Sequence, residues 1–169
     1  MAVADQILKN FAGFIDGKGY AGQIENFKPP TLNLTGEDVR VGGMDTSIFL
    51  EMGQEKMESE FHLLGYKSDI LKLWGVGSGN VVQFVFRGAL VNLDASVEPV
   101  NITMNGTVRE MAPDQWEAGK KAGLKFTIAL RSYTLTQNGA VIHDIDVLNM
   151  KRVINGVDSL AAQRAAIGL

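Results

Sequence analysis

The chain of 169 residues contains no cysteine, a residue whose absence excludes whole classes of chemistry. Disulfides, thiolate nucleophiles and thiolate metal sites are impossible without it. The chain also lacks an apolar run long enough to cross a bilayer, so we expect no membrane anchoring. Its first residues show no basic segment followed by an apolar one. We therefore expect no secretory signal and a protein that is made and kept in a cytoplasm.

Charge and histidine are also scarce. The formal net charge is −3 and no cluster of lysine or arginine stands out, which argues against tight binding of duplex nucleic acid. The histidines are His62 and His143. Asp144 and Asp146 are near His143, but positions i, i+1 and i+3 of a strand do not share one face. The sequence therefore predicts no catalytic residue, no metal site and no cofactor.

Alternation of apolar and polar residues predicts strands through most of the chain, with polar faces in water. The turn dipeptide Asn138-Gly139 predicts a hairpin. The alternation changes phase between Leu130 and Tyr133, which indicates a β-bulge. The predicted strands cover residues 32–41, 57–63, 82–87, 100–109, 124–131 and 141–147.

Helices are predicted to be few and short. Ser68 can cap a helix over 69–74, and Asp158 can cap a second over 159–167. Residues 4–11 predict a helical turn or an ordered arm. The glycine-rich stretch 75–79 predicts a plain turn, because it does not lie between a strand and a helix as a phosphate loop would.

The central stretch from Leu32 to Leu64 is the most unusual part of the sequence. Two strand patterns flank residues 42–56, a connection much longer than a hairpin turn needs. This connection is apolar at its centre, so either the core of the subunit or a neighbouring subunit must cover it. We predict an extended loop that contacts a neighbour, with hinges at its glycines. Its predicted contact residues are Gly42, Gly43, Met44, Asp45, Ile48, Phe49, Leu50 and Met52.

Several segments together carry a family resemblance. They include Arg40-Val-Gly-Gly-Met-Asp45 and Val153-Ile-Asn-Gly-Val-Asp-Ser-Leu160, in the same order and at similar spacing along the whole chain. The chain resembles the major tail tube protein of contractile-tailed bacteriophages and the tube protein of R-type bacteriocins. Val39 and Thr31 depart from residues common in that family.

The resemblance implies one structural domain over residues 1–169. The implied fold is mainly β, an antiparallel β-sandwich or barrel with a short flanking α-helix and a C-terminal helix. Six copies would form a ring with a continuous inner β-barrel, and rings would stack into a hollow tube. The 42–56 loop would reach the adjacent ring. Asn155, Asp158 and Leu160 would belong to a C-terminal interface.

The implied function is mechanical. The tube would be driven through a cell envelope by sheath contraction and would conduct DNA, or ions in a bacteriocin. Its partners would be copies of itself, the tail sheath, the tape-measure protein, the baseplate hub and the tail terminator, with DNA passing without specific binding. It would be located in a virion tail or bacteriocin particle that is assembled in the host bacterial cytoplasm.

The polar strand faces supply candidates for the channel wall. A wall with surplus acid would repel DNA phosphates, whereas a basic wall would bind them. The candidate lining residues are Glu58, Glu60, Asn101, Thr103 and Asn105.

Two other functions remain open on the residues alone. A β-sandwich that binds a small molecule or glycan could use aromatic rings such as Trp116 and Tyr133. An enzyme could use His143 with Asp144 or Asp146.

Overall fold

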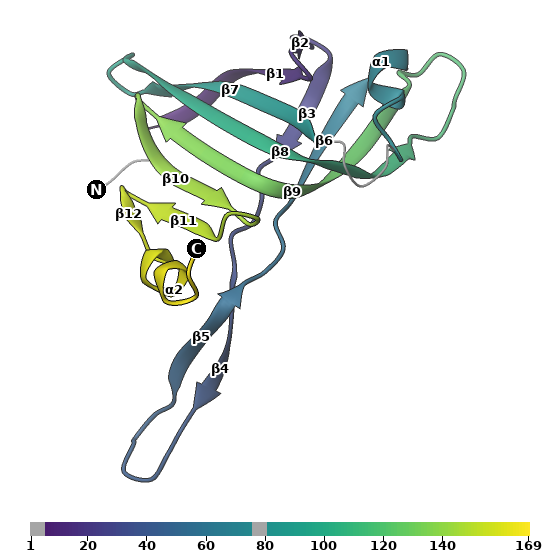
Figure 1. Cartoon of the computed structure of the whole chain (residues 1–169). Helices are drawn as coiled ribbons and strands as arrows, with labels where there is room; N and C mark the ends of the chain where they lie inside the picture. The colour runs from purple at the N-terminus through teal and green to yellow at the C-terminus, as the bar shows by residue number, and fades with distance from the viewer. Residues whose placement is uncertain (1–5, 76–80) are drawn as a thin grey trace.

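The computed structural model of the chain describes residues 6–75 and 81–169, and these form antiparallel β-sheets with two short helices (Figure 1). The helices are α1 (Ser68–Leu71) and α2 (Ala161–Ala166). The strands are β1 (Gln6–Ile15), β2 (Lys18–Gly19), β3 (Ile24–Lys28), β4 (Leu34–Val39), β5 (Ile48–Gln54), β6 (Glu58–Leu64), β7 (Val82–Asn92), β8 (Val97–Pro113), β9 (Gly123–Gln137), β10 (Ala140–Asp146), β11 (Lys151–Ile154) and β12 (Val157–Asp158).

Ten strands form one branched sheet. Its main order is β12-β11-β10-β9-β8-β7-β1-β2, while β6 also pairs with β9 and carries β3 beyond it. Strand β9 pairs with β8 along its length, with β6 through residues 123–129 and with β10 through residues 132–137. The described residues form no ladder between β1 and β3. The predicted sandwich or barrel is therefore an open sheet that curls around a core, without closing within one subunit.

The branch in the sheet coincides with a β-bulge in β9. Leu130 lies opposite Gly106 and Ser132 lies opposite Asn105, so Arg131 is the extra residue. A bulge adds local twist. Because it inserts one residue, the side chains that face the core change from even-numbered to odd-numbered positions. Leu130 and Tyr133 are consequently both buried. The predicted phase change is confirmed, and the bulge falls where β9 exchanges β6 for β10 as its neighbour.

The core lies inside the curled sheet and is built on phenylalanine. Phe61 and Phe126 stack with ring centroids 4.9 Å apart, and Phe84 lies 6.1 Å from Phe61. All three side chains are fully buried. They come from β6, β7 and β9, so the packing joins three strands that are distant in sequence. Burial of such side chains is the main stabilising term for this subunit.

The predicted helices differ from those observed. Residues 6–11 belong to strand β1 rather than to a helical turn, because they pair with β7; residues 4 and 5 lie outside the described part. Helix α1 has Lys67 at its N-cap position rather than Ser68, and it ends before Trp74, which is exposed. Of the predicted turn at 75–79, residues 76–79 also lie outside the described part. In the part of the chain that is described, no helix has the length and apolar character needed to cross a membrane.

The C-terminal region contains a hairpin that alternation alone did not predict. Strands β11 and β12 are joined by Asn155-Gly156, whose φ angles of 48° and 80° are those of a tight hairpin turn. Helix α2 begins at Ala161, later than predicted, with Leu160 at its N-cap position. The Asn-Gly dipeptide was the available signal for this hairpin.

Asp158 anchors α2 to this hairpin. Its carboxylate accepts hydrogen bonds from the backbone N–H of Leu160 (3.1 Å) and of Arg152 (3.4 Å), and it pairs with Arg164 (3.0 Å). The hydrogen bond from Leu160, with those from Arg164 and Arg152, holds the pKa of the Asp158 carboxyl below its ordinary value. The predicted N-cap is therefore wrong: no side chain caps α2, and Asp158 accepts instead from the backbone N–H of Leu160, the residue that precedes the helix.

The core predicts a large cost for removing one aromatic ring. We expect Phe61→Ala to lower the free energy of unfolding by about 3–5 kcal/mol, because it leaves a cavity among the stacked rings. Phe49→Ala is the matched control, since Phe49 is 55% exposed on the outlying hairpin; it should cost about 0.5 kcal/mol. Urea unfolding of the dispersed subunit measures both. Equal losses of unfolding free energy in the two variants would show that Phe61 does not belong to the core.

The lowered pKa of Asp158 predicts a pH dependence for α2. A carboxyl whose pKa is depressed in the folded state stabilises that state above its unfolded pKa of about 3.9. This contribution is lost as the pH falls through the lower folded value. The protection of the α2 amides against hydrogen exchange, measured by NMR relative to the unfolded chain at the same pH, should fall over that acidic range while that of β9 stays high. In Asp158→Asn, the protection of α2 should be low already at neutral pH and should no longer fall in the acidic range.

Candidate assembly surfaces

An apolar hairpin projects from the curled sheet (Figure 1). We define the apolar hairpin as residues 34–54, which comprise β4, the turn and β5; its two strands form a separate antiparallel sheet. Ile48, Phe49 and Leu50 are each more than half exposed, and Met52 is 66% exposed. The core of the subunit therefore does not cover these side chains. Of the two possibilities that the sequence left open, coverage by the subunit's own core is excluded.

The prediction of a loop over 42–56 is wrong for residues 48–54, about half of that range. Residues 48–54 are strand β5, which pairs with β4 from Leu34↔Gln54 to Val39↔Ile48. The chain turns between Arg40 and Ser47, where Gly43 has a φ of 91°. Gly42 and Asp45 are exposed in this turn, and Met44 is held there by hydrogen bonds with Val41 and Arg40.

A close approach explains a glycine inside the hairpin. A Cβ at Gly36 would lie 2.3 Å from the carbonyl oxygen of Leu50 and 2.6 Å from the Phe49 ring, so any larger residue would force the ribbon apart. Successive side chains of a strand alternate in direction. Ile48 and Leu50 therefore share one face of the ribbon while Phe49 lies on the other, over Gly36. Both faces of the hairpin are apolar in part.

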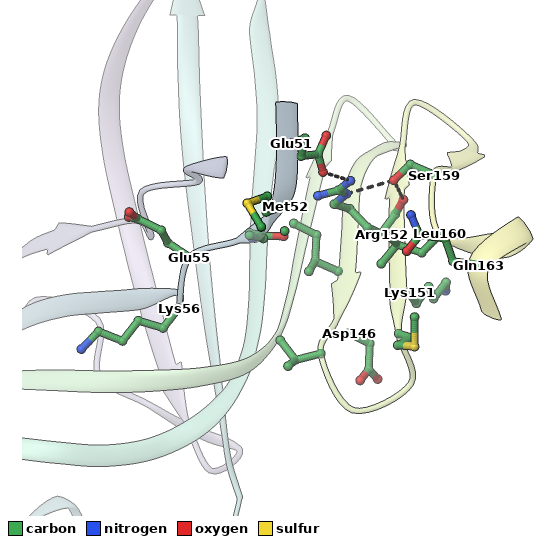
Figure 2. Close-up of a pocket in the computed structure, with 15 residues that line it drawn as sticks. Glu51, Met52, Glu55, Lys56, Asp146, Lys151, Arg152, Ser159, Leu160 and Gln163 are labelled. Atoms are coloured by element: carbon green, nitrogen blue, oxygen red, sulfur yellow. Dashed lines mark hydrogen bonds and ion pairs between the residues drawn. The ribbon is translucent and has the colours of Figure 1, made fainter. Parts of the chain in front are cut away.

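The base of the hairpin contacts the C-terminal region across a groove of about 570 Å³ (Figure 2). Arg152 of β11 reaches across to Glu51 of β5 at 2.5 Å, and its Nε donates to the Ser159 hydroxyl at 2.9 Å. The Arg152 side chain is only 14% exposed. Of the predicted C-terminal interface, Leu160 lines this groove, Asp158 anchors α2 and Asn155 lies in the exposed β11–β12 turn. Sequence reasoning did not single out Arg152 or Glu51.

The candidate channel residues all lie on one face of the branched sheet. Asn101, Thr103 and Asn105 alternate on β8 with the buried Ile102 and Met104. Their cross-strand partners Ser132, Thr134 and Thr136 on β9 continue the polar surface. Glu58 and Glu60 alternate on β6 with the buried Ser59 and Phe61 and thus extend the same face. We call this surface the polar face.

The two glutamates of the polar face are each balanced by cations. Glu58 accepts from Lys56 at 2.9 Å and also pairs with Arg109, and Glu60 pairs with Lys125 at 3.1 Å. The hydrogen bond from Lys56, with the charge of Arg109, holds the pKa of Glu58 below its ordinary value. Both carboxylates are thus paired with cations. The predicted surplus of acid is absent at these two positions.

A half-buried histidine near this face also contacts carboxylates. The Nε2 atom of His62 lies 2.8 Å from Asp114, and its Nδ1 atom lies 2.9 Å from Glu25, in a direction that makes no hydrogen bond. These contacts join β6 to β3 and to the loop after β8. Within the described residues, no group of three or more histidine, cysteine, aspartate or glutamate side chains is placed to hold a metal ion.

The residues of the two other functions are not brought together. Tyr133 is buried in the core, whereas Trp116 is 76% exposed and donates a hydrogen bond to Tyr66. Asp144 pairs with Lys151 at 2.5 Å, and Asp146 accepts from Asn149. His143 lies beside Tyr133, with ring centroids 6.3 Å apart. Within the described residues, His143 makes no ion pair with Asp144 or Asp146, and Trp116 and Tyr133 do not share one site.

Comparison with known proteins adds independent information. The family model described as phage tail tube protein FII matches residues 5–168. The tail tube protein of Escherichia phage P2 is 26% identical over 166 residues, which are 96% of this chain and 96% of that protein.

Solved structures of similar fold come from contractile injection systems. A chain of the PVC sheath/tube terminator in the extended state has a TM-score of 0.57 and 8% identity over 76% of this chain and 94% of its own length. A chain of the PVC sheath-tube complex in the extended state has a TM-score of 0.55 and 8% identity. The match covers 75% of this chain and 87% of that one. A chain of the anti-feeding prophage baseplate has a TM-score of 0.52 and 9% identity. The match covers 83% of this chain and 98% of that one. At these identities the likeness concerns the fold.

The family match extends over nearly the whole chain. Tail tube proteins are structural components of their particles rather than enzymes. The chain therefore belongs to the family of phage tail tube proteins.

Proposed function

We propose that this chain, as one domain over residues 1–169, forms the inner tube of a contractile injection tail. Six copies close into a ring, the curled sheets join into a continuous inner β-barrel, and rings stack into a hollow tube. The observation that carries the proposal is the apolar hairpin, whose Ile48, Phe49, Leu50 and Met52 are exposed in the single subunit. An exposed apolar patch of this kind is characteristic of a protein interface.

The energetics of the hairpin support contact with another copy. A two-stranded ribbon alone is at best marginally stable in water, so this one gains from packing against a partner. Burial of one large apolar side chain stabilises by roughly 1.5–3 kcal/mol. Several such side chains in each of six subunits exceed the cost of ordering the ribbon. The hairpin is thus the main source of cohesion between rings.

The polar face lines the conduit in this proposal. Its amides, hydroxyls and balanced ion pairs present neither a basic wall that would hold phosphates nor an apolar wall that would hold protein. DNA passes without specific binding in a phage, and ions pass in a bacteriocin. The tape-measure protein fills the channel before ejection.

The outer partners follow from the same assembly. The structural neighbours are a sheath/tube terminator, a sheath-tube complex and a baseplate, which supports a tail sheath, a tail terminator and a baseplate hub as partners of this tube. Contraction of the sheath drives the tube through the target envelope. The particle is assembled in the host bacterial cytoplasm and carries the tube in its tail.

Removal of the apolar side chains tests the stacking role. We expect the triple variant Ile48→Ser, Phe49→Ser, Leu50→Ser to remain folded, because none of these side chains belongs to the core. It should lose long tubes while single rings persist, as judged by sedimentation and electron microscopy. The matched control is Val141→Ser with Leu148→Ser and Val157→Ser, which are also exposed but lie outside the hairpin.

Two results would contradict the stacking role. Long tubes of normal length from the hairpin variant would show that cohesion lies elsewhere. An unfolded hairpin variant would show that the hairpin stabilises its own subunit.

Charge reversal tests the polar face as a channel wall. We expect Glu58→Lys with Glu60→Lys to slow DNA ejection from assembled particles several-fold, because the two new lysines with Lys56, Arg109 and Lys125 would present five cations to the phosphates at each subunit. The control Glu60→Lys with Lys125→Glu exchanges the two ends of one ion pair and leaves the net charge unchanged. It should eject DNA at the parental rate.

Single-particle ejection measured at two salt concentrations tests whether the slowing is electrostatic. Slowing that is relieved at high salt indicates phosphate binding. Unchanged ejection by the double-lysine variant in tubes of normal length would place the polar face outside the channel.

A further inference from the structure

A groove of about 240 Å³ lies between the start of β1 and the end of β3, on the core side of the sheet; we call it the apolar groove. The Phe27 and Phe86 rings stack there with centroids 3.7 Å apart, and Leu8 at its border is 55% exposed. A cavity of about 150 Å³ holds a benzene molecule, so this groove has room for an indole ring. The apolar side chains that line it include Leu8, Phe11, Phe27, Phe86, Leu90 and Val100.

The charge on the groove side of the sheet is negative. Glu98 lies opposite Leu90 and shares its face of β8 with Val100, which lines the groove. Arg87 borders the groove, but its guanidinium lies over the Phe14 ring, on the opposite face of the sheet. The groove therefore favours an apolar partner that brings one cation. Within the described residues, the donors to the Glu98 carboxylate are neutral amides, which belong to Gln6, Asn92 and Gln137.

An exposed pair of aromatic residues lies at the other end of β8. Trp116, in the loop that joins β8 to β9, is 76% exposed and donates a hydrogen bond from Nε1 to the Tyr66 hydroxyl at 2.7 Å. The two rings meet edge to face with centroids 5.7 Å apart, and we call them the aromatic pair. Because Tyr66 holds the indole in one position, insertion of this ring into a partner costs little side-chain entropy. Tryptophan and tyrosine are frequent anchors of protein interfaces.

The loop of the aromatic pair carries the cation that the groove lacks. Lys121 and Trp116 line the same shallow hollow of this loop. Lys120 pairs with Glu117 at 2.5 Å, whereas Lys121 makes no ion pair within the described part of the chain. A contact between Lys121 and Glu98 thus joins one unpaired charge of each sign beside the apolar contact of the indole.

Charge argues against two other apolar surfaces as the occupant. The apolar hairpin carries four carboxylates against the single guanidinium of Arg40, so it would bring like charge to Glu98. The C-terminal region exposes Leu148 and Ile167, but its cations are engaged in ion pairs of their own. The aromatic pair is the apolar surface whose charge complements the groove.

The aromatic pair cannot reach the groove of its own subunit. Val100 lines the groove near the start of β8, and the loop with Trp116 follows Pro113 at the end of this strand. A strand rises about 3.3 Å per residue, so the two sites are roughly 40 Å apart along β8. The partner is therefore another copy. The apolar hairpin projects across the direction in which β8 runs (Figure 1), so copies stacked through the hairpin have the ends of β8 at their sides.

We propose that Trp116 of the aromatic pair inserts into the apolar groove of the next subunit of the same ring, with Lys121 against Glu98. This inference rests on the proposed tube function and identifies the contact that closes its rings. The two surfaces are different parts of the subunit, so the contact is heterologous and repeats from copy to copy around a ring.

Crosslinking tests the contact directly, because the chain has no cysteine of its own. An untagged Gln115→Cys chain and a size-tagged Leu8→Cys chain are each checked for folding by circular dichroism, mixed, assembled into tubes and treated with a short bismaleimide. We expect the linked heterodimer on a denaturing gel to be at least about tenfold more abundant than with a tagged Val157→Cys chain, since contact raises the effective concentration of the thiols. Val157 is the matched control because it is 69% exposed on β12, outside the groove.

A cycle of charge variants tests the ion pair. We expect Lys121→Glu to raise the protein concentration required for assembly about fivefold, because it sets two carboxylates against each other. The matched control Lys72→Glu makes the same change at an exposed lysine that follows α1, and it should leave this concentration unchanged. Addition of Glu98→Gln to Lys121→Glu should reverse most of the increase, since one of the two opposed carboxylates is then removed.

The outcomes separate this inference from the function beneath it. Preferential linkage that persists in single rings of the triple serine variant supports a contact within the ring, whereas linkage confined to stacked tubes would place it between rings and overturn the proposal. Equal linkage to Leu8→Cys and Val157→Cys in normal tubes, or no relief by Glu98→Gln, would also overturn it while leaving the tube function intact. A chain that forms neither rings nor tubes, even on a baseplate, would instead reject the tube function.

Discussion

Burial of apolar surface is the constraint on which the rest of this structure depends, and it operates at two levels. Within the subunit, the rings of Phe61, Phe84 and Phe126 are removed from water by a sheet that curls around them. The same chain leaves Phe49 and its neighbours in water on a thin ribbon. The subunit therefore folds around a buried core and leaves a second apolar surface exposed, as the proposed assembly into a tube requires.

The long strand β9 connects these two levels. It pairs with β8 throughout, and the bulge at Arg131 lets it pair first with β6 and then with β10. One partner, β6, continues from the apolar hairpin, and the other, β10, leads to the C-terminal region. The ion pair between Glu51 and Arg152 then joins the hairpin base to β11. The direction of the hairpin is therefore set by the same strand that organises the core.

The carboxylates of Glu58 and Glu60 on the polar face are held in ion pairs. Glu58 and Glu60 each have a cation within ion-pairing distance. Exposed pairs of this kind contribute little to stability. In the proposed channel, their consequence would instead be a weaker attraction of the face for DNA phosphates.

The sequence by itself determined the broad class, and the tertiary structure decided the geometry. Alternation, which reports burial on one face of a strand, was sufficient to predict the strands around Phe61 and Ile128 and the bulge near Arg131. The Asn138-Gly139 dipeptide was sufficient to predict its turn. The apolar residues from Ile48 to Met52 could also be recognised from the sequence as a surface that needs a partner to cover it. Alternation could not reveal that these residues pair with β4, because pairing depends on register between segments and not on either segment alone.

The contacts of charged side chains required the fold for the same reason. Nothing near Glu58 or Glu60 in sequence indicates Arg109 or Lys125, which are more than fifty residues away in the chain and adjacent only across strands. Arg152 and Glu51 are likewise joined across about a hundred residues. Local pattern encodes which side of a strand is wet, whereas long-range register decides which charges meet there.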